Sequence, residues 1–320
     1  METLEHLRGQ IKTTDDLKGV VRTMKALAAV GIHQNERAVH ALRVYARAVE
    51  LGLQVMFRND PGLSALRGAH GRVEAEAVDS RPLGLVVFGS DHGLCGRFND
   101  EIVAHVVERL GSIPGARPRI LAVGARTGMR LEQAGLGLEQ TLLVPGTASH
   151  ITPVVRRILQ RLDDWRSQGT RQVMLAYNQH LSGARYSSVW QRLTPLDTTA
   201  LAGLRNAPWP SKVLPTYSMP RDELLQALLR QYIFINVFRA CAESLASESG
   251  ARLAAMHAAG RNLEERHNEL SALFRRLRQT MITAELLDVV NGYEALLEQS
   301  VNAEAPGGSD MCDLEEVPGR

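Results

Sequence analysis

The stretch that decides the fold is residues 256–281, which read MHAAGRNLEERHNELSALFRRLRQTM. Large apolar side chains recur in it every seven residues, at Met256, Leu263, Leu270 and Leu277. Phe274 and Met281 follow the last two of these by four residues, which is the second spacing of a heptad. The pattern is typical of a helix in a left-handed coiled coil, although Gly260 and His267 are poor residues for the second apolar position. A core-facing helix of an ordinary bundle is the alternative.

The distribution of proline extends this helix and adds a second one. No proline occurs within residues 1–60 or 221–305, whereas eleven of the thirteen prolines lie within residues 61–220. Proline costs about 3 kcal/mol inside a helix, so both proline-free regions are predicted to be helical. The second region, as one helix, would extend roughly 130 Å, more than a single compact domain needs. We expect an N-terminal helix over 1–58 that pairs with a C-terminal helix over 221–299.

The middle of the chain, residues 81–201, is predicted to form a small α/β domain. Three short apolar runs are predicted strands: Leu83–Phe88, Arg119–Val123 and Val173–Tyr177. Two segments between them are predicted helices: Asn99–Leu110 and Ile151–Gln168. The second helix is expected to have Thr152 as its cap and Pro153 in its first turn. Strands that alternate with helices at this spacing indicate a mainly parallel sheet, and the predicted fold class is α/β with a Rossmann-like domain.

Two linkers and a tail complete the predicted organisation. Residues 59–80 contain Asn-Asp-Pro-Gly, and residues 202–220 hold four prolines; both are predicted linkers. In residues 300–320 the segment Pro306-Gly307-Gly308 breaks the helix, and five acidic residues accompany a single arginine. We expect this tail to be acidic and disordered.

Composition narrows the class of protein. A net charge of +2 argues against a nucleic-acid binder, which is usually strongly basic. The sequence has no run of about 18 apolar residues and no signal-peptide pattern, so we expect membrane association only through a partner. Cys95, Cys241 and Cys312 are far apart and form no C-x-x-C pair, which predicts neither a disulfide framework nor a zinc site.

A glycine-rich turn, Gly89 to Gly96, follows the first predicted strand. Backbone N–H groups of such a turn can hold a phosphate, but this one lacks the lysine of a P-loop and does not fit G-x-G-x-x-G. We favour a tight strand-to-helix connection that needs glycine conformations. Its structural residues are predicted to be Ser90, Asp91, Gly93, Cys95 and Gly96.

Catalytic and metal sites are not predicted. Cys95 with His92 invites a nucleophile–base interpretation, but no third group that would orient the histidine is evident. H-E-x-x-H and other metal-ligand spacings do not occur. The sequence therefore predicts no catalytic residues, no cofactor and no metal site in this chain.

Polar side chains gather near the end of the C-terminal helix. The basic ones are Arg275, Arg276 and Arg278, and beside them lie Gln279, Thr283 and Glu285. The simpler interpretation is a solvent-exposed helix face on which side chains four residues apart interact with each other. A contact surface for another protein is the alternative that we favour, because the planar guanidinium of arginine pairs with both oxygens of a carboxylate.

Three segments carry a family resemblance. The first runs from Ile11-Lys12 through Val21-Arg22-Thr23-Met24-Lys25 to Val30, and the second is Ser90 to Gly96 followed by Asn99. The third combines Ala246-Ser247-Glu248, Arg252 and Met256 with Arg278-Gln279, Ile282-Thr283 and Glu285-Leu286. In their order and spacing, over about residues 1–298, these segments resemble the gamma subunit of the rotary F-type ATP synthases.

The resemblance implies a central rotor stalk. The two long helices would form an antiparallel coiled coil inside a ring of alpha and beta subunits, and the α/β domain would lie near the epsilon subunit and the c-ring. Rotation would couple ion flow through the c-ring to ATP synthesis or hydrolysis on other chains, so the subunit itself is expected to be non-catalytic. The expected location is peripheral, at the cytoplasmic face of a bacterial inner membrane.

The resemblance also implies contact roles for individual residues. Residues expected to meet loops of the ring are Arg278, Gln279, Thr283 and Glu285. Met24 and Lys25 are expected to face the C-terminal helix and an acidic segment of a beta subunit, and Arg252 to lie on the coupling surface.

The chain departs from the family pattern at Asp15-Asp16, at Gly31 to Glu36, at His92 and at Arg97-Phe98. Basic residues are usual at the first three places, and glycine followed by a small residue at the fourth. These departures and the acidic tail indicate a divergent member and leave open an alternative ATPase class, with protons or sodium ions transported. A rival function is a coiled-coil scaffold whose α/β domain binds a nucleotide or acts as an enzyme.

Overall fold

The structure is a computed structural model that describes residues 3–58, 82–113, 115, 118–196, 207–213 and 215–303. The predicted linker 59–80, part of the linker 202–220 and the tail beyond residue 303 lie outside the described residues. The chain divides into two compact units, one of residues 1–18 and 262–320 and the other of residues 19–261. Two long helices, α1 (Leu4–Arg58) and α7 (Arg221–Ala303), contribute to both units.

The larger unit contains a five-stranded sheet. Its strands are β1 (Leu83–Phe88), β2 (Arg119–Val123), β3 (Leu138–Leu142), β4 (Gln172–Ser182) and β5 (Arg185–Thr194). The strand order is β3-β2-β1-β4-β5, with β1 to β4 parallel and β5 antiparallel to β4. The predicted α/β class with a mainly parallel sheet is therefore confirmed.

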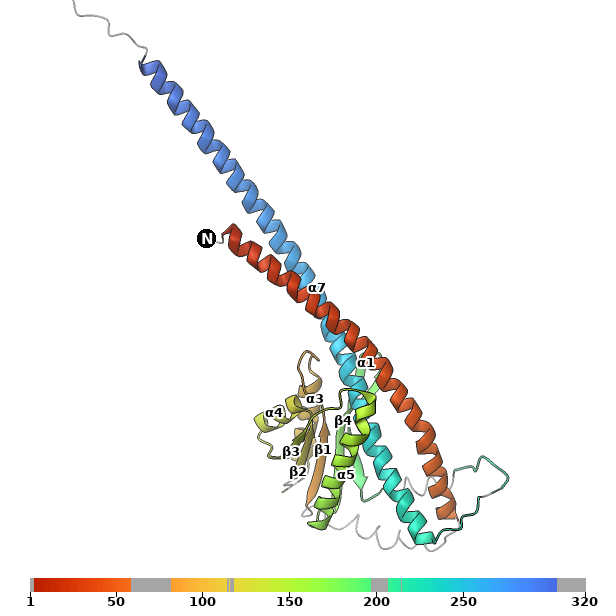
Figure 1. The fold of residues 1–320 in the computed structure, drawn as a ribbon. Coiled ribbons are helices and arrows are strands. Elements are labelled where there is room, and N and C mark those ends of the chain that lie inside the picture. Colours follow the sequence, from red (N-terminus) through yellow and green to blue (C-terminus); the bar gives the residue numbers. More distant parts are fainter. Residues whose placement is uncertain are drawn as a thin grey trace, which may run out of the picture. The chain divides into compact units, whose positions relative to one another are not determined.

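Helices cover both faces of the sheet (Figure 1). They are α3 (Phe98–Gly111), α4 (Ala125–Gln133) and α5 (Ile151–Ser167), with the short 3₁₀ helix η2 (Ala148–His150) before α5. Because side chains alternate along a strand, Leu85 and Val87 of β1 pack with Ile102 of α3. The intervening residues of the strand, Val86 and Phe88, pack on the other face with α5 and α7. The domain thus has three layers, and α7 is part of one of them.

Within the larger unit, α1 and α7 run antiparallel. Tyr45 Oη donates a hydrogen bond of 2.9 Å to Gln231 Oε1. A Cβ atom added at Gly31 would lie 2.9 Å from Ser249 Oγ. The earlier residue of α1 therefore contacts the later residue of α7, which is the antiparallel order. Toward the C-terminal end of α1, apolar side chains of the two helices pack together around Leu53 of α1 and Ile235 of α7. The predicted antiparallel pairing is confirmed.

In the smaller unit α1 and α7 are paired as well. Leu7 of α1 and Leu270 of α7 are both buried, and Asp15 Oδ1 lies 3.1 Å from His267 Nδ1. The predicted heptad positions are buried or half-buried as far as Leu277. Met281, the last predicted member of the seam, is exposed.

Some local predictions were wrong or incomplete. Helix α5 begins at Ile151 with His150 at the N-cap and no side-chain hydrogen bond, so Thr152 is not the cap. Pro153 does lie in the first turn, where its missing N–H costs nothing. Helix α4 and strands β3 and β5 were not predicted, because they are short or only half-buried and lack a continuous apolar run.

Candidate functional site

The turn after β1 is held by a buried polar network. Ser90 N–H donates to Asn99 Oδ1 at 3.1 Å and to Thr127 Oγ1 at 3.0 Å. Thr127 Oγ1 donates to Asn99 Oδ1 at 2.7 Å, and Asn99 Nδ2 donates to Ser90 Oγ at 2.7 Å. All three side chains are buried, so the network fixes the turn on the starts of α3 and α4.

Asp91 joins the ends of two further strands to this turn. One carboxylate oxygen accepts the N–H of Ala125 at 2.8 Å, and the other accepts the N–H of Val144 at 2.9 Å. Leu94 and Gly96 have φ values of 64° and 61°, so the chain turns twice through the left-handed region. Glycine adopts this conformation readily, whereas leucine does so at a cost.

The predicted turn residues differ in their structural roles. Cys95 is buried against Phe98 of α3 and Ala251 of α7. Its thiol lies 3.8 Å from the backbone carbonyl of His92, and burial raises its pKa. Both observations disfavour a nucleophile activated by the His92 imidazole. Gly93 has no close neighbour, and nothing in the structure explains a glycine there.

Helix α7 occupies the place where doubly wound folds bind ligands. That place is the crevice at the carboxyl ends of the strands where the strand order reverses, here between β1 and β4. Ser247 Oγ donates to the Asn178 carbonyl of β4 at 2.9 Å, and Ala251 packs on the turn after β1. Ser247 and Ala251 of α7 thus occupy the crevice between β1 and β4, which argues against the rival function as a nucleotide-binding domain.

Four of the predicted site residues line one cavity, which we call the Met24 cavity. Its volume is about 380 Å³. The four residues are Met24, Asp91, Gly93 and Arg252. Lys25 is half-buried next to Met24 and does not line the cavity. The fold therefore brings the N-terminal segment, the turn and the start of the C-terminal signature together.

A partly buried ion pair forms part of the wall of this cavity. Arg252 Nη2 donates to Glu248 Oε1 at 2.5 Å, one helical turn away. Burial raises the pKa of Glu248, and the Arg252 guanidinium opposes that shift. Glu248 was part of the sequence signature, and its spacing of four residues from Arg252 was the signal that could have identified the pair.

The remaining predicted contact residues lie on an exposed part of α7 in the smaller unit. Every residue from 278 to 297 is exposed. Thr283 Oγ1 donates to the carbonyl of Gln279 at 2.9 Å, and Arg278 and Glu285 belong to the same exposed stretch. Its exposed apolar residues are Met281, Ile282, Leu286, Leu287, Val289, Val290, Tyr293, Leu296 and Leu297. At about 100° per residue, most of these side chains lie along one face of the helix, and a wide exposed apolar face is typical of a contact surface for a partner.

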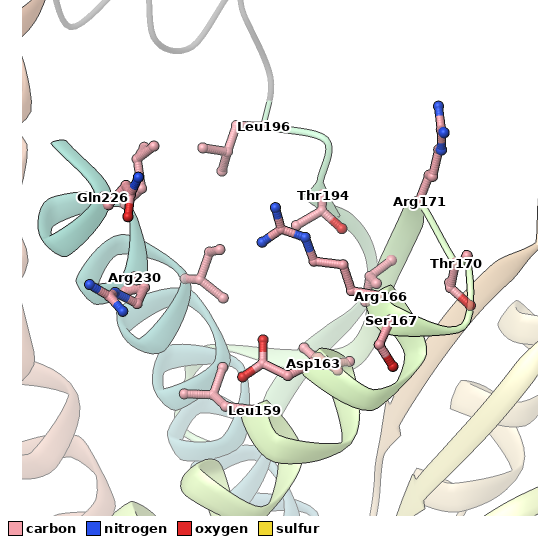
Figure 2. A pocket seen from close by; sticks show the side chains of 15 residues that line it. Leu159, Asp163, Arg166, Ser167, Thr170, Arg171, Thr194, Leu196, Gln226 and Arg230 are labelled. Atoms are coloured by element: carbon pink, nitrogen blue, oxygen red, sulfur yellow. The ribbon is translucent and has the colours of Figure 1, made fainter. Parts of the chain in front are cut away.

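A larger hollow of about 990 Å³ lies between α5 and α7 in the larger unit. Asp163 and Arg166 extend from α5 toward α7, whereas Arg171 points away from the hollow (Figure 2). Its apolar side is formed by residues such as Leu159 and Leu229. The arginines are exposed to solvent, so the hollow is a basic surface with an apolar floor.

Similarity to known proteins shows to which family a chain with these features belongs. The model of a family described as ATP synthase matches residues 3–296. Curated relatives over this length are named ATP synthase gamma chain. The chain belongs to the ATP synthase gamma-chain family.

Two of these gamma chains show how far the similarity extends. The gamma chain of Polynucleobacter asymbioticus is 24% identical over 92% of this chain and 100% of its own length. That of Acidovorax sp. (strain JS42) is 25% identical over 91% of this chain and 99% of its own. The family model ends at residue 296, so the last residues of this chain extend beyond it.

Solved structures share the fold of this gamma-chain family member. A chain of the Euglena gracilis mitochondrial ATP synthase, in a structure of OSCP, F1 and c-ring, has a TM-score of 0.63 and 16% identity. It covers 97% of this chain and 99% of that chain. A chain in the rotor structure of the same enzyme has a TM-score of 0.56, also at 16% identity.

Two properties of the described residues bear on the chemistry of this gamma chain. No cluster of three or more His, Cys, Asp or Glu side chains suited to a metal ion occurs in the described ranges. No helix of the described part combines the length and the apolar character that crossing a membrane requires.

Proposed function

We propose that this chain is the central rotor stalk of a rotary F-type ATP synthase. The observation that carries the proposal is the exposed stretch 278–297 of α7, which presents nine large apolar side chains on a helix. Apolar surface of this extent is costly in water, so a surrounding partner is expected to cover it. Subunits named alpha and beta in ATP synthases would form that surrounding ring.

The coupling residues are assigned on the same basis. Arg278, Gln279, Thr283 and Glu285 would contact loops of the ring from the exposed stretch. Met24 and Lys25 would meet a beta subunit, and Arg252 would transmit the contact through its pairing with Glu248. These contacts would differ with the rotation angle, and a difference in contact free energy is what couples separate sites.

The remaining partners follow from the α/β domain. We infer that the epsilon subunit and the c-ring contact the larger unit, with the basic surface between α5 and α7 in Figure 2 as one contact. The chain would itself be non-catalytic, because Ser247 and Ala251 of α7 occupy the crevice between β1 and β4 where doubly wound folds bind ligands. Its location would be peripheral, at the cytoplasmic face of a bacterial inner membrane.

Reconstitution tests this function. The full chain, added to alpha and beta subunits together with epsilon and the membrane sector, is expected to restore ATP-driven ion pumping in vesicles. A chain that ends at Leu277 is the matched control, because it keeps the paired helices and lacks only the exposed stretch and the residues after it. It should fold, as measured by circular dichroism, and fail to support pumping. Failure of the full chain to restore pumping would refute the proposal.

A further inference from the structure

The Met24 cavity is built entirely from the larger unit. Its walls come from α1, the turn at residues 91–94, the segment 144–147 and the part of α7 from Leu245 to Arg252. Its volume of about 380 Å³ falls within the range of about 300–1,000 Å³ that small-molecule sites occupy. Ala28, Val144 and Leu245 are among the apolar residues that line it.

Two buried polar side chains in the wall have no partner. Asn35 of α1 is 7% exposed, and Ser249 of α7 is 8% exposed. Neither side chain makes a hydrogen bond within the part of the chain that the structure describes. Their polar atoms are not among the fully buried unpaired ones, so they are open to the cavity and can pair with water or with a guest there.

The charges that face the cavity are unbalanced. Asp91 and Glu248 contribute two carboxylates, whereas Arg252 contributes one guanidinium, and His92 is the other titratable group in the lining. Each Asp91 oxygen accepts one backbone N–H and keeps capacity for another donor. A cationic guest would offset this excess of negative charge, and an anionic one would increase it.

The rim of the cavity is apolar. Leu27 is 63% exposed and Leu94 is 56% exposed, and both line the opening. Leu94 keeps this position through its left-handed backbone, at φ 64°. A ligand that reaches the carboxylates therefore passes between apolar side chains, which favours an apolar stem behind its charged group.

We propose that the Met24 cavity binds a compact amphipathic cation, a primary amine or guanidine carried on a short apolar stem. The charged group pairs with the Asp91 and Glu248 carboxylates, and the stem packs against Ala28, Leu245 and the rim. The proposal is independent of the role as a rotor stalk, because it concerns the chain by itself.

Isothermal titration of the purified full chain with n-hexylamine, near neutral pH and at low salt, tests the proposal. n-Hexanol serves as the neutral probe of the same length and n-hexanoate as the anionic one. We expect saturable binding of the amine, with the alcohol weaker by about tenfold or more, since a charge-assisted hydrogen bond is lost. Absence of saturable amine binding, which indicates a cavity that holds water only, or equal binding of amine and alcohol would overturn the proposal.

A matched pair of variants locates the site. Ala28→Met fills the cavity, whereas Ala254→Met adds the same side chain at an exposed position of α7. Amine binding should be lost in the first variant and retained in the second; equal binding in both would place the amine elsewhere. Should Ala28→Met not fold by circular dichroism, Glu248→Gln decides the question. It should weaken binding of the amine by about tenfold while leaving the alcohol unchanged, and an unchanged affinity for the amine would contradict the proposal.

Discussion

Gly250 of α7 lies directly against the carbonyl oxygen of Gly183, in the turn between β4 and β5. A Cβ atom at position 250 would be 2.7 Å from that oxygen and 3.3 Å from the Cα atom of Ala184. Both neighbours are backbone atoms, so they cannot rotate away from an added methyl group as a flexible side chain would. The close approach of helix and hairpin therefore depends on the absence of a side chain at this position.

The variant Gly250→Ala should be less stable than the natural chain by about 1–3 kcal/mol, the usual cost of overpacking. In an open helix position the same change stabilises by about 1 kcal/mol, because alanine is the better helix former. Gly19→Ala provides that comparison, since Gly19 of α1 has no neighbour within 4 Å. Urea unfolding of both variants measures the difference. A Gly250→Ala chain as stable as Gly19→Ala would show that the contact with Gly183 is not close.

Asn99 is the centre of the buried network behind the turn. Its Oδ1 accepts from Ser90 N–H and from Thr127 Oγ1, and its Nδ2 donates to Ser90 Oγ. Asn99→Leu keeps the volume but leaves the hydroxyl groups of both neighbours without this partner. We expect a loss of about 2 kcal/mol or more in the free energy of unfolding, because buried unpaired polar groups are costly. Ser112→Ala, which removes an exposed hydroxyl that bonds to the Arg109 carbonyl, should cost about 0.5 kcal/mol or less.

Glu243 of α7 should make stability depend on pH. Its Oε2 is buried and has no hydrogen-bond partner within the described residues. Burial raises its pKa above 4.5, although Arg239, Gln179 and Arg43 oppose the shift. The folded chain therefore binds this proton more tightly than the unfolded chain, and the stability linked to it is lost as pH rises from 4.5 through the folded pKa.

The variant Glu243→Gln isolates this effect. Near neutral pH it should be more stable than the natural chain, because it buries no carboxylate. The advantage should shrink as the pH falls toward 4.5, where the natural carboxyl group is increasingly protonated. Urea unfolding of both chains across this range measures the difference. An advantage that does not change with pH would show that the carboxyl group keeps its ordinary pKa in the folded chain.

The sequence predicts the elements of this fold that have long or continuous patterns. β1 and β2 have the predicted bounds, because each is a run of buried apolar residues between polar segments. β5 was missed, since only Leu193 is buried along it and its position depends on pairing with β4. The cap of α5 was assigned to Thr152 because threonine is a frequent cap. In the structure α5 instead follows η2 directly, with His150 at the N-cap.

Two of the four departures from the family pattern, at Asp15-Asp16 and at Gly31 to Glu36, lie beside partners far away in the sequence. His267 is a poor seam residue, and it lies 3.1 Å from Asp15, which stands where basic residues are usual. Gly31 allows Ser249 to approach α1, and Glu36 Oε1 lies 3.3 Å from His180 Nε2 of β4. One residue of such a pair does not reveal the other in the sequence. The sequence therefore shows that these positions are unusual, but it does not show which residue each one contacts.

Thr283→Lys should impair the coupled enzyme without affecting the chain by itself. Residue 283 is exposed on α7, so a lysine there should leave the melting temperature nearly unchanged. In the assembled ATP synthase the charge would enter the interface with the ring, and ATP-driven ion pumping should fall by about tenfold or more. Thr283→Val is the matched variant, because it has nearly the same shape and no charge; it should retain most of the pumping. Full pumping by the lysine variant would remove Thr283 from the contact surface.

Deletion of residues 301–320 should leave assembly and pumping intact. The family model ends at residue 296, and the gamma chain of Polynucleobacter asymbioticus aligns over its whole length with 92% of this chain. The contacts that gamma chains need are therefore expected to lie before the deleted segment, which carries five acidic residues and one arginine. Gel filtration of the reconstituted complex measures assembly, and vesicle assays measure pumping. A truncated chain that melts like the full chain but fails to assemble would show that the acidic extension is itself a subunit contact.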